Sequence, residues 1–209
     1  EKLLEQDREF RKPVKFIIAN EKALEEDERF LEADLNSSFP GDINSEKYEE
    51  RLAAKIKEHV YGKKVLDLHT THSTEKPFAN VKDFVEDTVE MLRMTGVENS
   101  ACFPEDSGVL IEMASTGVLV ETGPQGKEKA VEDAQKVLEN FLNCFGVFEG
   151  DCVKSNPNLF EHFDTVEGDW VFEAENFKIV EEGDVYASRN DEELVAEEDF
   201  YPVLMSTNG

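Results

Sequence analysis

The sequence predicts an α/β protein: a mainly parallel or mixed sheet with helices on both faces, followed by a small, mostly β domain. Up to residue 146, short runs of branched apolar residues alternate with longer stretches whose apolar residues recur at helical spacing, which is typical of strands joined by helices. After Gly146 the helical spacing stops, and short alternating runs broken by Gly and Asn follow. We therefore divide the chain into an α/β domain, residues 1–146, and a β-rich domain, residues 147–209.

Four strands are expected in the first domain, each a short and mostly apolar run. They are residues 14–19, 64–68, 97–103 and 117–121. The first of them, Val-Lys-Phe-Ile-Ile-Ala, is rich in branched residues, which predicts a buried strand. The stretch from residue 20 to residue 40 is expected to be a long irregular connection.

Three helices are expected between these strands, because apolar residues recur every three or four positions. The first begins near Ser45, a residue type that caps helices, and ends at Gly62. The others span residues 81–96 and 127–145. Residues 1–10 indicate the end of a further amphipathic helix. In the second domain, short strands are expected at residues 169–174, 177–180 and 185–187.

The chain is strongly acidic, with 48 Asp and Glu against 22 Lys and Arg and a net charge of -26. It is not a disordered acidic tail, because 39% of its residues are hydrophobic and 15 are Phe. The charge argues against binding to nucleic acid or to an anionic membrane. It is typical of a halophilic protein, since molar salt screens self-repulsion to about 3 Å.

The three cysteines, Cys102, Cys144 and Cys152, contain no CxxC pair and are odd in number. We therefore expect reduced, mostly buried thiols rather than a disulfide framework or a thiolate zinc site. No signal peptide is recognisable at Glu1, and no apolar run approaches the roughly 20 residues of a membrane-spanning helix. Together these features predict a cytoplasmic protein.

Polar side chains collect in three segments where strands end and loops begin, which are residues 29–40, 66–78 and 118–125. Asp67 and His69 are two apart on a strand and so share a face. Glu121 ends an apolar strand before a Gly-Pro turn, where partial burial would raise its pKa as a general base requires. Arg29 lies in the first segment.

Each of these residues also has a structural interpretation. A single His at a strand end is more often a hydrogen-bonding residue than a metal ligand. Glu121 could be one more solvated carboxylate, and Arg29 could pair with Glu28 or Glu32. His72 is a weaker ligand candidate than His69, because a loop does not bring the two rings together. The remaining histidines, His59 and His162, are expected at the surface.

Taken together, the three segments resemble the succinylglutamate desuccinylase/aspartoacylase family, a branch of the zinc carboxypeptidase-like fold. The family's Arg, DLNR and FPG block is similar to Arg29, Asp34-Leu35-Asn36-Ser37 and Phe39-Pro40-Gly41. Its D-L-H strand end is similar to Asp67-Leu68-His69, and its E-x-G-P-Q block to residues 121–125. Residues 195–205 resemble the family's closing segment, which carries a substrate-contacting Tyr.

This resemblance implies a zinc-dependent amidohydrolase that cleaves a small N-acyl amino acid. It implies that His69 is the third zinc ligand, Glu121 the general base and Arg29 a carbonyl or carboxylate binder. Asn36 and Tyr201 would contact the substrate. A zinc ion lowers the pKa of a bound water towards about 7, which is the chemistry such a site would use.

The chain departs from the family pattern in two places. The family's first two zinc ligands belong to an early H-x-x-E motif, whereas the first His of this chain is His59. We expect that motif upstream of Glu1, and we expect the 209 residues alone to bind zinc weakly and to be inactive. Ser37 and Ile111 stand where the family has basic residues, which favours a less acidic substrate or compensation by Lys76.

Two alternatives stay open. One is a zinc carboxypeptidase acting on peptides, and the other is a metal-free binding protein on the same scaffold. The sequence also leaves open whether the chain forms a homo-oligomer.

Overall fold

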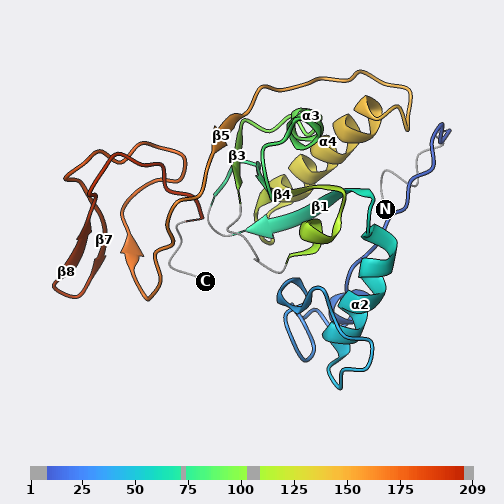
Figure 1. Ribbon diagram of the computed structural model, residues 1–209, viewed down its shortest axis with the longest axis horizontal. Helices are drawn as coiled ribbons and strands as arrows, with labels where there is room; N and C mark the ends of the chain where they lie inside the picture. Colours follow the sequence, from blue (N-terminus) through green and yellow to red (C-terminus); the bar gives the residue numbers. More distant parts are fainter. Residues whose placement is uncertain (1–8, 72–73, 103–108, 205–209) are drawn as a thin grey trace.

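The computed structural model describes residues 9–71, 74–102 and 109–204, which form a five-stranded sheet and a separate three-stranded sheet (Figure 1). In chain order the helices and strands are α1 (Glu21–Glu25), η1 (Asn36–Ser38), α2 (Tyr48–Val60), β1 (Lys64–Thr71), β2 (Phe78–Val81), α3 (Glu86–Arg93), β3 (Asn99–Cys102), η2 (Leu110–Met113), β4 (Thr116–Pro124), α4 (Glu128–Cys144), β5 (Asn158–Phe160), β6 (Val171–Phe172), β7 (Val185–Arg189) and β8 (Glu192–Val195). The α/β class expected from the sequence is confirmed.

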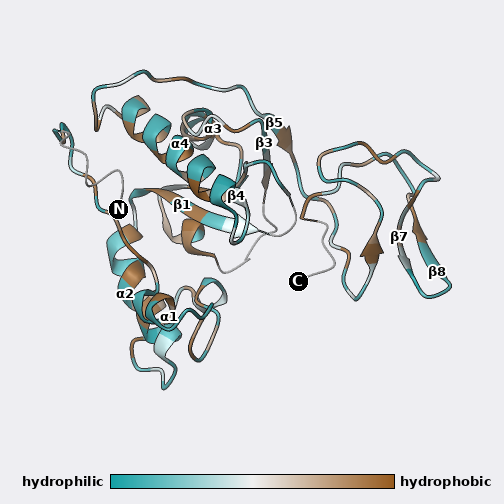
Figure 2. Cartoon of the chain, turned by 180° about the vertical axis from the view of Figure 1, so that it is seen from behind, coloured by the Kyte–Doolittle hydropathy of each residue, from teal (hydrophilic) through white to brown (hydrophobic). Residues whose placement is uncertain are grey.

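The larger sheet has the strand order β1-β4-β2-β3-β5 and is mainly parallel. Only the pairing of β2 with β4 is antiparallel. Helices α3 and α4 cover one face, where Val118 and Val120 pack with Leu92 and Phe141. The other face is covered by η2 and α2, whose Ile56 belongs to a cluster that includes Val65 of β1. Figure 2 shows polar residues (teal) on the outward turns of α4.

Helix α3 begins five residues later than the sequence predicts. The expected helix starts at Val81, but residues 78–81 form β2, which the sequence analysis missed. Asp83 sets the new start, because its Oδ1 accepts hydrogen bonds from the Val85 backbone N–H and the Thr88 hydroxyl. These hydrogen bonds tie Asp83, two residues before the N-cap Val85, to the first turn of the helix.

The expectation of a buried strand at residues 14–19 is wrong. This segment forms no ladder with a described strand, and Val14, Phe16 and Ile18 are 37–54% exposed. The physical reason is the lack of a neighbour: β1, at the edge of the larger sheet, pairs with β4 alone. Of the helix expected at residues 1–10, residues 1–8 lie outside the described part of the chain.

The smaller sheet has the antiparallel order β6-β7-β8 and spans residues 171–195. The strand expected at residues 177–180 is reduced to a single bridge between Val180 and Phe200. β5 pairs with β3 and therefore belongs to the larger sheet. A row of aromatic contacts joins the C-terminal residues to β2. The rings are, in order, Phe78, Phe177, Phe160 and Tyr201, and neighbouring centroids are 5.1–5.3 Å apart.

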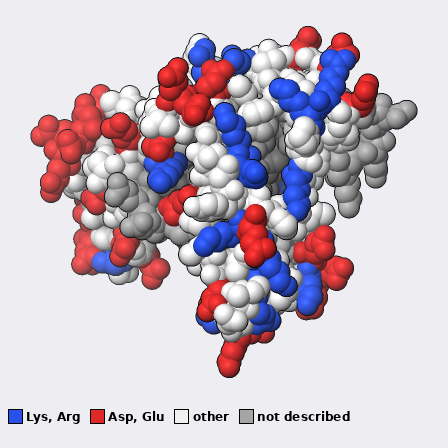
Figure 3. Space-filling view, turned by 45° about the vertical axis from the view of Figure 1, so that its right-hand side comes forward, with Lys and Arg blue, Asp and Glu red and all other residues white. Residues whose placement is uncertain are grey.

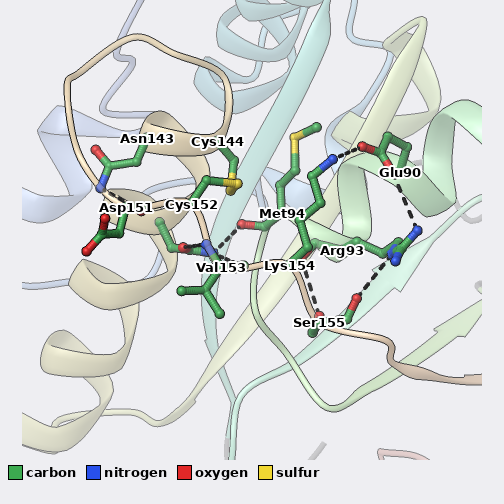
Figure 4. The surroundings of a disulfide bond; sticks show 11 residues. Glu90, Arg93, Met94, Asn143, Cys144, Asp151, Cys152, Val153, Lys154 and Ser155 are labelled. Carbon is green, nitrogen blue, oxygen red and sulfur yellow. Dashed lines mark hydrogen bonds and ion pairs between the residues drawn. A yellow bond between two sulfur atoms is a disulfide. The ribbon is translucent and has the colours of Figure 1, made fainter.

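The expectation of three reduced thiols is also wrong. Cys144, the last residue of α4, forms a disulfide with Cys152 (Figure 4). The chain turns back after α4, so that the two Cα atoms are 4.6 Å apart although neither cysteine belongs to a CxxC pair. The Ser155 backbone N–H donates to the Arg93 carbonyl oxygen, and Arg93 Nε donates to the Ser155 carbonyl oxygen. The chain after the disulfide is therefore also attached to the end of α3. Cys102 is free.

The negative charge is unevenly distributed along the chain. Residues 147–209 contain 17 Asp and Glu but only 3 Lys and Arg, whereas 13 of the 22 basic residues precede residue 65. Figure 3 shows Lys and Arg along the middle of one face with Asp and Glu among them, so this face is mixed rather than uniformly negative. In the described part of the chain, no helix is both long and apolar enough to cross a membrane.

Candidate functional site

The candidate site is built on the adjacent ends of β1 and β4. Because the two strands are parallel and in register, His69 of β1 lies directly beside Glu121 of β4. Asp67 is two residues before His69 and shares its face. Its Oδ2 is 3.0 Å from the His69 Nε2. A carboxylate bonded in this way fixes the orientation of an imidazole ring.

The surroundings of His69 favour a positive charge. Burial lowers the pKa of His69, but the hydrogen bond to Asp67 and the charges of Asp67, Glu121 and Asp34 outweigh it, so the pKa is raised. The three carboxylates therefore create a local negative potential at the imidazole. A cation, whether a proton or a metal ion, is stabilised there.

Glu121 is partly buried and incompletely hydrogen-bonded. Its Oε2 is buried and has no hydrogen-bond partner. Burial raises the pKa of Glu121; the nearby His69 lowers it and Asp67 raises it again, and the net shift is upward. A carboxylate with a raised pKa and an unpaired oxygen can accept a proton from a bound molecule.

Arg29 and Asn36 lie in one loop that is organised by Asp34. The Asp34 Oδ2 accepts a 2.8 Å hydrogen bond from Arg29 Nε, and its Oδ1 accepts one of 2.8 Å from the Asn36 backbone N–H. Arg29 therefore pairs with Asp34 rather than with Glu28 or Glu32. Its side chain is 75% exposed. Leu35 and Phe39 of the same loop pack in a cluster that includes Val65 of β1, and the charge of Asp34 contributes to the raised pKa of His69.

The loop is anchored by a residue that the sequence analysis missed. Glu49, in the first turn of α2, is fully buried and accepts hydrogen bonds from the backbone N–H groups of Leu31, Glu32 and Ala33. The Asn20 side chain donates a fourth. Burial alone would raise the pKa of Glu49, but these hydrogen bonds lower it. A buried carboxylate thus fixes the backbone between Arg29 and Asn36.

Tyr201 reaches the strand ends only through other aromatic rings. Its ring contacts Phe160 at 5.2 Å, Phe177 contacts Phe160 at 5.3 Å, and Phe78 contacts Phe177 at 5.1 Å. Phe78 is the β2 partner of Glu121. Phe160 lies on the same face of the sheet as Asn80 and Glu121, because Ala101 is the partner of both Phe160 and Asn80. Tyr201, which contacts Phe160, is 47% exposed.

The other candidates are separate from this site. His59 and His162 are exposed, as expected, and His72 lies outside the described residues. Lys76 pairs with Glu98 and lines a cavity with Asp133 and Lys136 of α4.

The donor set can be tested against the zinc ion that the sequence resemblance implies. Such a site needs about three protein ligands. His69 offers one imidazole, whose Nε2 already contacts Asp67, and no three His, Cys, Asp or Glu groups converge in the described part of the chain. These residues do not fit a zinc ion by themselves, and we assign no chemical step to zinc.

Comparison with known proteins gives a consistent picture. A family model described as the succinylglutamate desuccinylase/aspartoacylase catalytic domain matches residues 1–145. No curated protein matches the sequence. Murine aminoacylase 3 has a similar structure, with a TM-score of 0.72 and 14% identity over 91% of this chain and 77% of that chain.

Two bacterial structures are similar as well. A succinylglutamate desuccinylase from Vibrio parahaemolyticus has a TM-score of 0.69 and 18% identity over 92% of this chain. The product-bound ectoine utilization protein from Ruegeria pomeroyi has a TM-score of 0.64 and 20% identity over 88%. The chain spans 66% of the length of each. At these identities the likeness shows the fold alone.

Proposed function

Because the chain belongs to the succinylglutamate desuccinylase/aspartoacylase catalytic-domain family, we propose that it forms the catalytic part of a hydrolase that cleaves the amide bond of an N-acyl amino acid. The main support from the structure is the pairing of His69 with Glu121 at the ends of two parallel strands. Their surroundings separate the two roles: the imidazole attracts a cation, and the carboxylate, whose pKa is raised, can take a proton.

Glu121 is proposed as the general base. Its carboxylate accepts a proton from the attacking water and then transfers that proton to the leaving amine, which is the usual role of a carboxylate with a raised pKa. Both the burial of this carboxylate and its missing hydrogen-bond partner support the assignment.

Arg29 is proposed to bind a substrate carboxylate or the developing oxyanion. A guanidinium binds such groups with paired hydrogen bonds. In the structure the same donors contact Asp34, so a substrate acid group would exchange with that carboxylate. Asn36, in the same loop, and Tyr201, at the end of the aromatic row, are proposed substrate contacts.

Zinc is proposed as the cofactor, with His69 as one ligand. The other ligands would have to come from outside the described residues. Ser37 and Ile111, which are not basic, favour a less acidic acyl amino acid than the acylated aspartate or glutamate of the family name. A cytoplasmic, salt-adapted enzyme remains our proposal from composition.

The proposal is tested with the protein expressed from its complete coding sequence. Zinc content is measured, and hydrolysis is assayed with acylated aspartate, acylated glutamate, acylated neutral amino acids and short peptides. About one zinc per chain and release of a free amino acid from an acylated one are expected. Release from peptides alone would instead indicate a carboxypeptidase. A metal-free, inactive protein would contradict the hydrolase and favour a binding protein.

A further inference from the structure

Asn80 of β2 lies on the same face of the sheet as the candidate site. It pairs directly with Leu119, which in turn pairs with Asp67. The next row towards the strand ends is His69, Glu121 and Phe78. Cross-strand partners share a face, so Asn80 is the diagonal neighbour of Glu121 across the β2–β4 ladder.

Asn80 is a polar residue in a position that the fold closes off from water. It is 1% exposed. Its partner Leu119 forms a buried cluster with Val109, just before η2, and Ile111, within η2. η2 packs closely against β4, because a Cβ atom added at Gly117 of β4 would lie only 2.6 Å from the Cβ atom of Ile111. An apolar side chain would suit this environment better than an amide.

An unpaired donor and an unpaired acceptor lie diagonally opposite each other across the β2–β4 ladder. Among the described residues, four buried polar side-chain atoms lack a hydrogen-bond partner, and they include the Asn80 Nδ2 and the Glu121 Oε2. The first is a donor and the second an acceptor. Diagonal neighbours in a sheet are about 7–8 Å apart, a separation that long side chains can bridge. Leaving both groups unpaired would cost free energy twice.

We propose that Asn80 is a positioning residue for Glu121: its Nδ2–H group holds the Oε2 oxygen, directly after a side-chain rotation or through one bound water. The proposal deepens the proposed function and rests on it, because it assigns Asn80 a role through the base. Asn80 aims the carboxylate while Oε1 remains available for the proton.

The sheet provides an internal control. The Ser100 Oγ is also buried and unpaired, on β3. Ser100 pairs with Ala79, which belongs to the core beneath α3 and α4, so it faces away from Glu121. A general effect of unpaired buried groups would involve Ser100 as much as Asn80.

The first experiment does not depend on activity. The side-chain amide of Asn80 is assigned by NMR in the wild-type protein and in Glu121→Gln. We expect both amide proton signals to move in Glu121→Gln and to stay in place in Ser100→Ala. If they do not respond to Glu121→Gln, the proposal is overturned, whether or not the protein is an enzyme.

The second experiment measures kinetics on the best acyl amino acid substrate. Asn80→Leu is expected to lower kcat about ten-fold with KM within about two-fold, because one hydrogen bond to a charged group is lost. Asn80→Asp, which removes the donor and adds a second carboxylate, is expected to lower kcat further. Ser100→Ala should match the wild type. Unchanged kcat in folded Asn80→Leu would overturn the proposal. An inactive wild type would contradict the proposed function instead and leave the NMR result decisive for Asn80.

Discussion

His69 and Glu121 are direct partners in the parallel ladder between β1 and β4. Their relative position is therefore set by the backbone hydrogen bonds between β1 and β4 and not by contact between the side chains. Exchange of either side chain should leave the other in place. Loss of activity can thus be separated from loss of structure at this pair.

Glu121→Gln is expected to lower kcat by roughly 10²- to 10⁴-fold, because an amide cannot accept the proton. The melting temperature should stay the same or rise, since the exchange removes the cost of burying a charged carboxylate. Steady-state kinetics and thermal unfolding check the two parts. Glu132→Gln, an exposed exchange on α4, is the control. Retained activity in Glu121→Gln would show that another group is the base.

Tyr201→Phe separates the hydroxyl of this residue from its ring. The ring contact with Phe160 is kept, so stability should not change, whereas KM should rise several-fold if the hydroxyl donates to the substrate. Tyr201→Ala should also lower the melting temperature, because it removes an aromatic contact worth about 1 kcal/mol. Kinetics and thermal unfolding of both variants are compared. Identical KM values for Tyr201→Phe and the wild type would remove Tyr201 from the substrate site.

The sequence predicts the elements whose pattern is local. Helix α4 and strand β4 were expected within a few residues of their observed bounds, because an amphipathic face and an apolar run report directly on burial. The prediction of a strand at residues 14–19 failed because a strand needs a neighbouring strand to pair with, which no local pattern reports. Strand β2 was missed because it is four residues long and contains Asn80.

The sequence identifies the candidate residues that follow strand ends, but not those whose burial is decided by tertiary structure. His69 and Glu121 were identified by their place at the end of apolar runs. Glu49 is one of 48 acidic residues and lies in an ordinary first helical turn. Only the fold reveals that three backbone N–H groups converge on it. The same is true of Asn80, whose burial depends on η2.

The thiols give a prediction that tests the disulfide. Denatured protein without reductant should contain one reactive thiol, Cys102, and reduced protein three. In the folded protein Cys102 should react slowly at pH 8, because burial and the nearby Glu161 and Asp83 raise the pKa of its thiol to about 11. Thiol titration with and without reductant checks this.

Exchange of both cysteines tests the same bond through stability. Cys144→Ser with Cys152→Ser should lower the free energy of unfolding by about 2 kcal/mol, as for a short closed loop. Cys102→Ala is the control for general effects of cysteine removal. Three reactive thiols in the unreduced protein would contradict the disulfide.

The buried carboxylate of Glu49 should make stability depend on pH. Its pKa is lowered from the ordinary 4.5, so the stabilisation it provides is complete above about pH 5 and is lost as the pH falls through the lowered pKa. Glu49→Ala, which leaves three backbone N–H groups unpaired, should lower the free energy of unfolding at pH 7 by about 3 kcal/mol. Glu49→Gln should lower the free energy of unfolding by less, because its carbonyl oxygen still accepts hydrogen bonds.

Urea unfolding from pH 7 to pH 3 measures the free energy of unfolding of both variants, with the exposed Glu58→Gln on the same helix as the control. The difference between wild type and Glu49→Gln should shrink only at the acid end. A difference that is the same at pH 3 and pH 7 would mean that the charge of Glu49 does not hold the loop of Arg29 and Asn36.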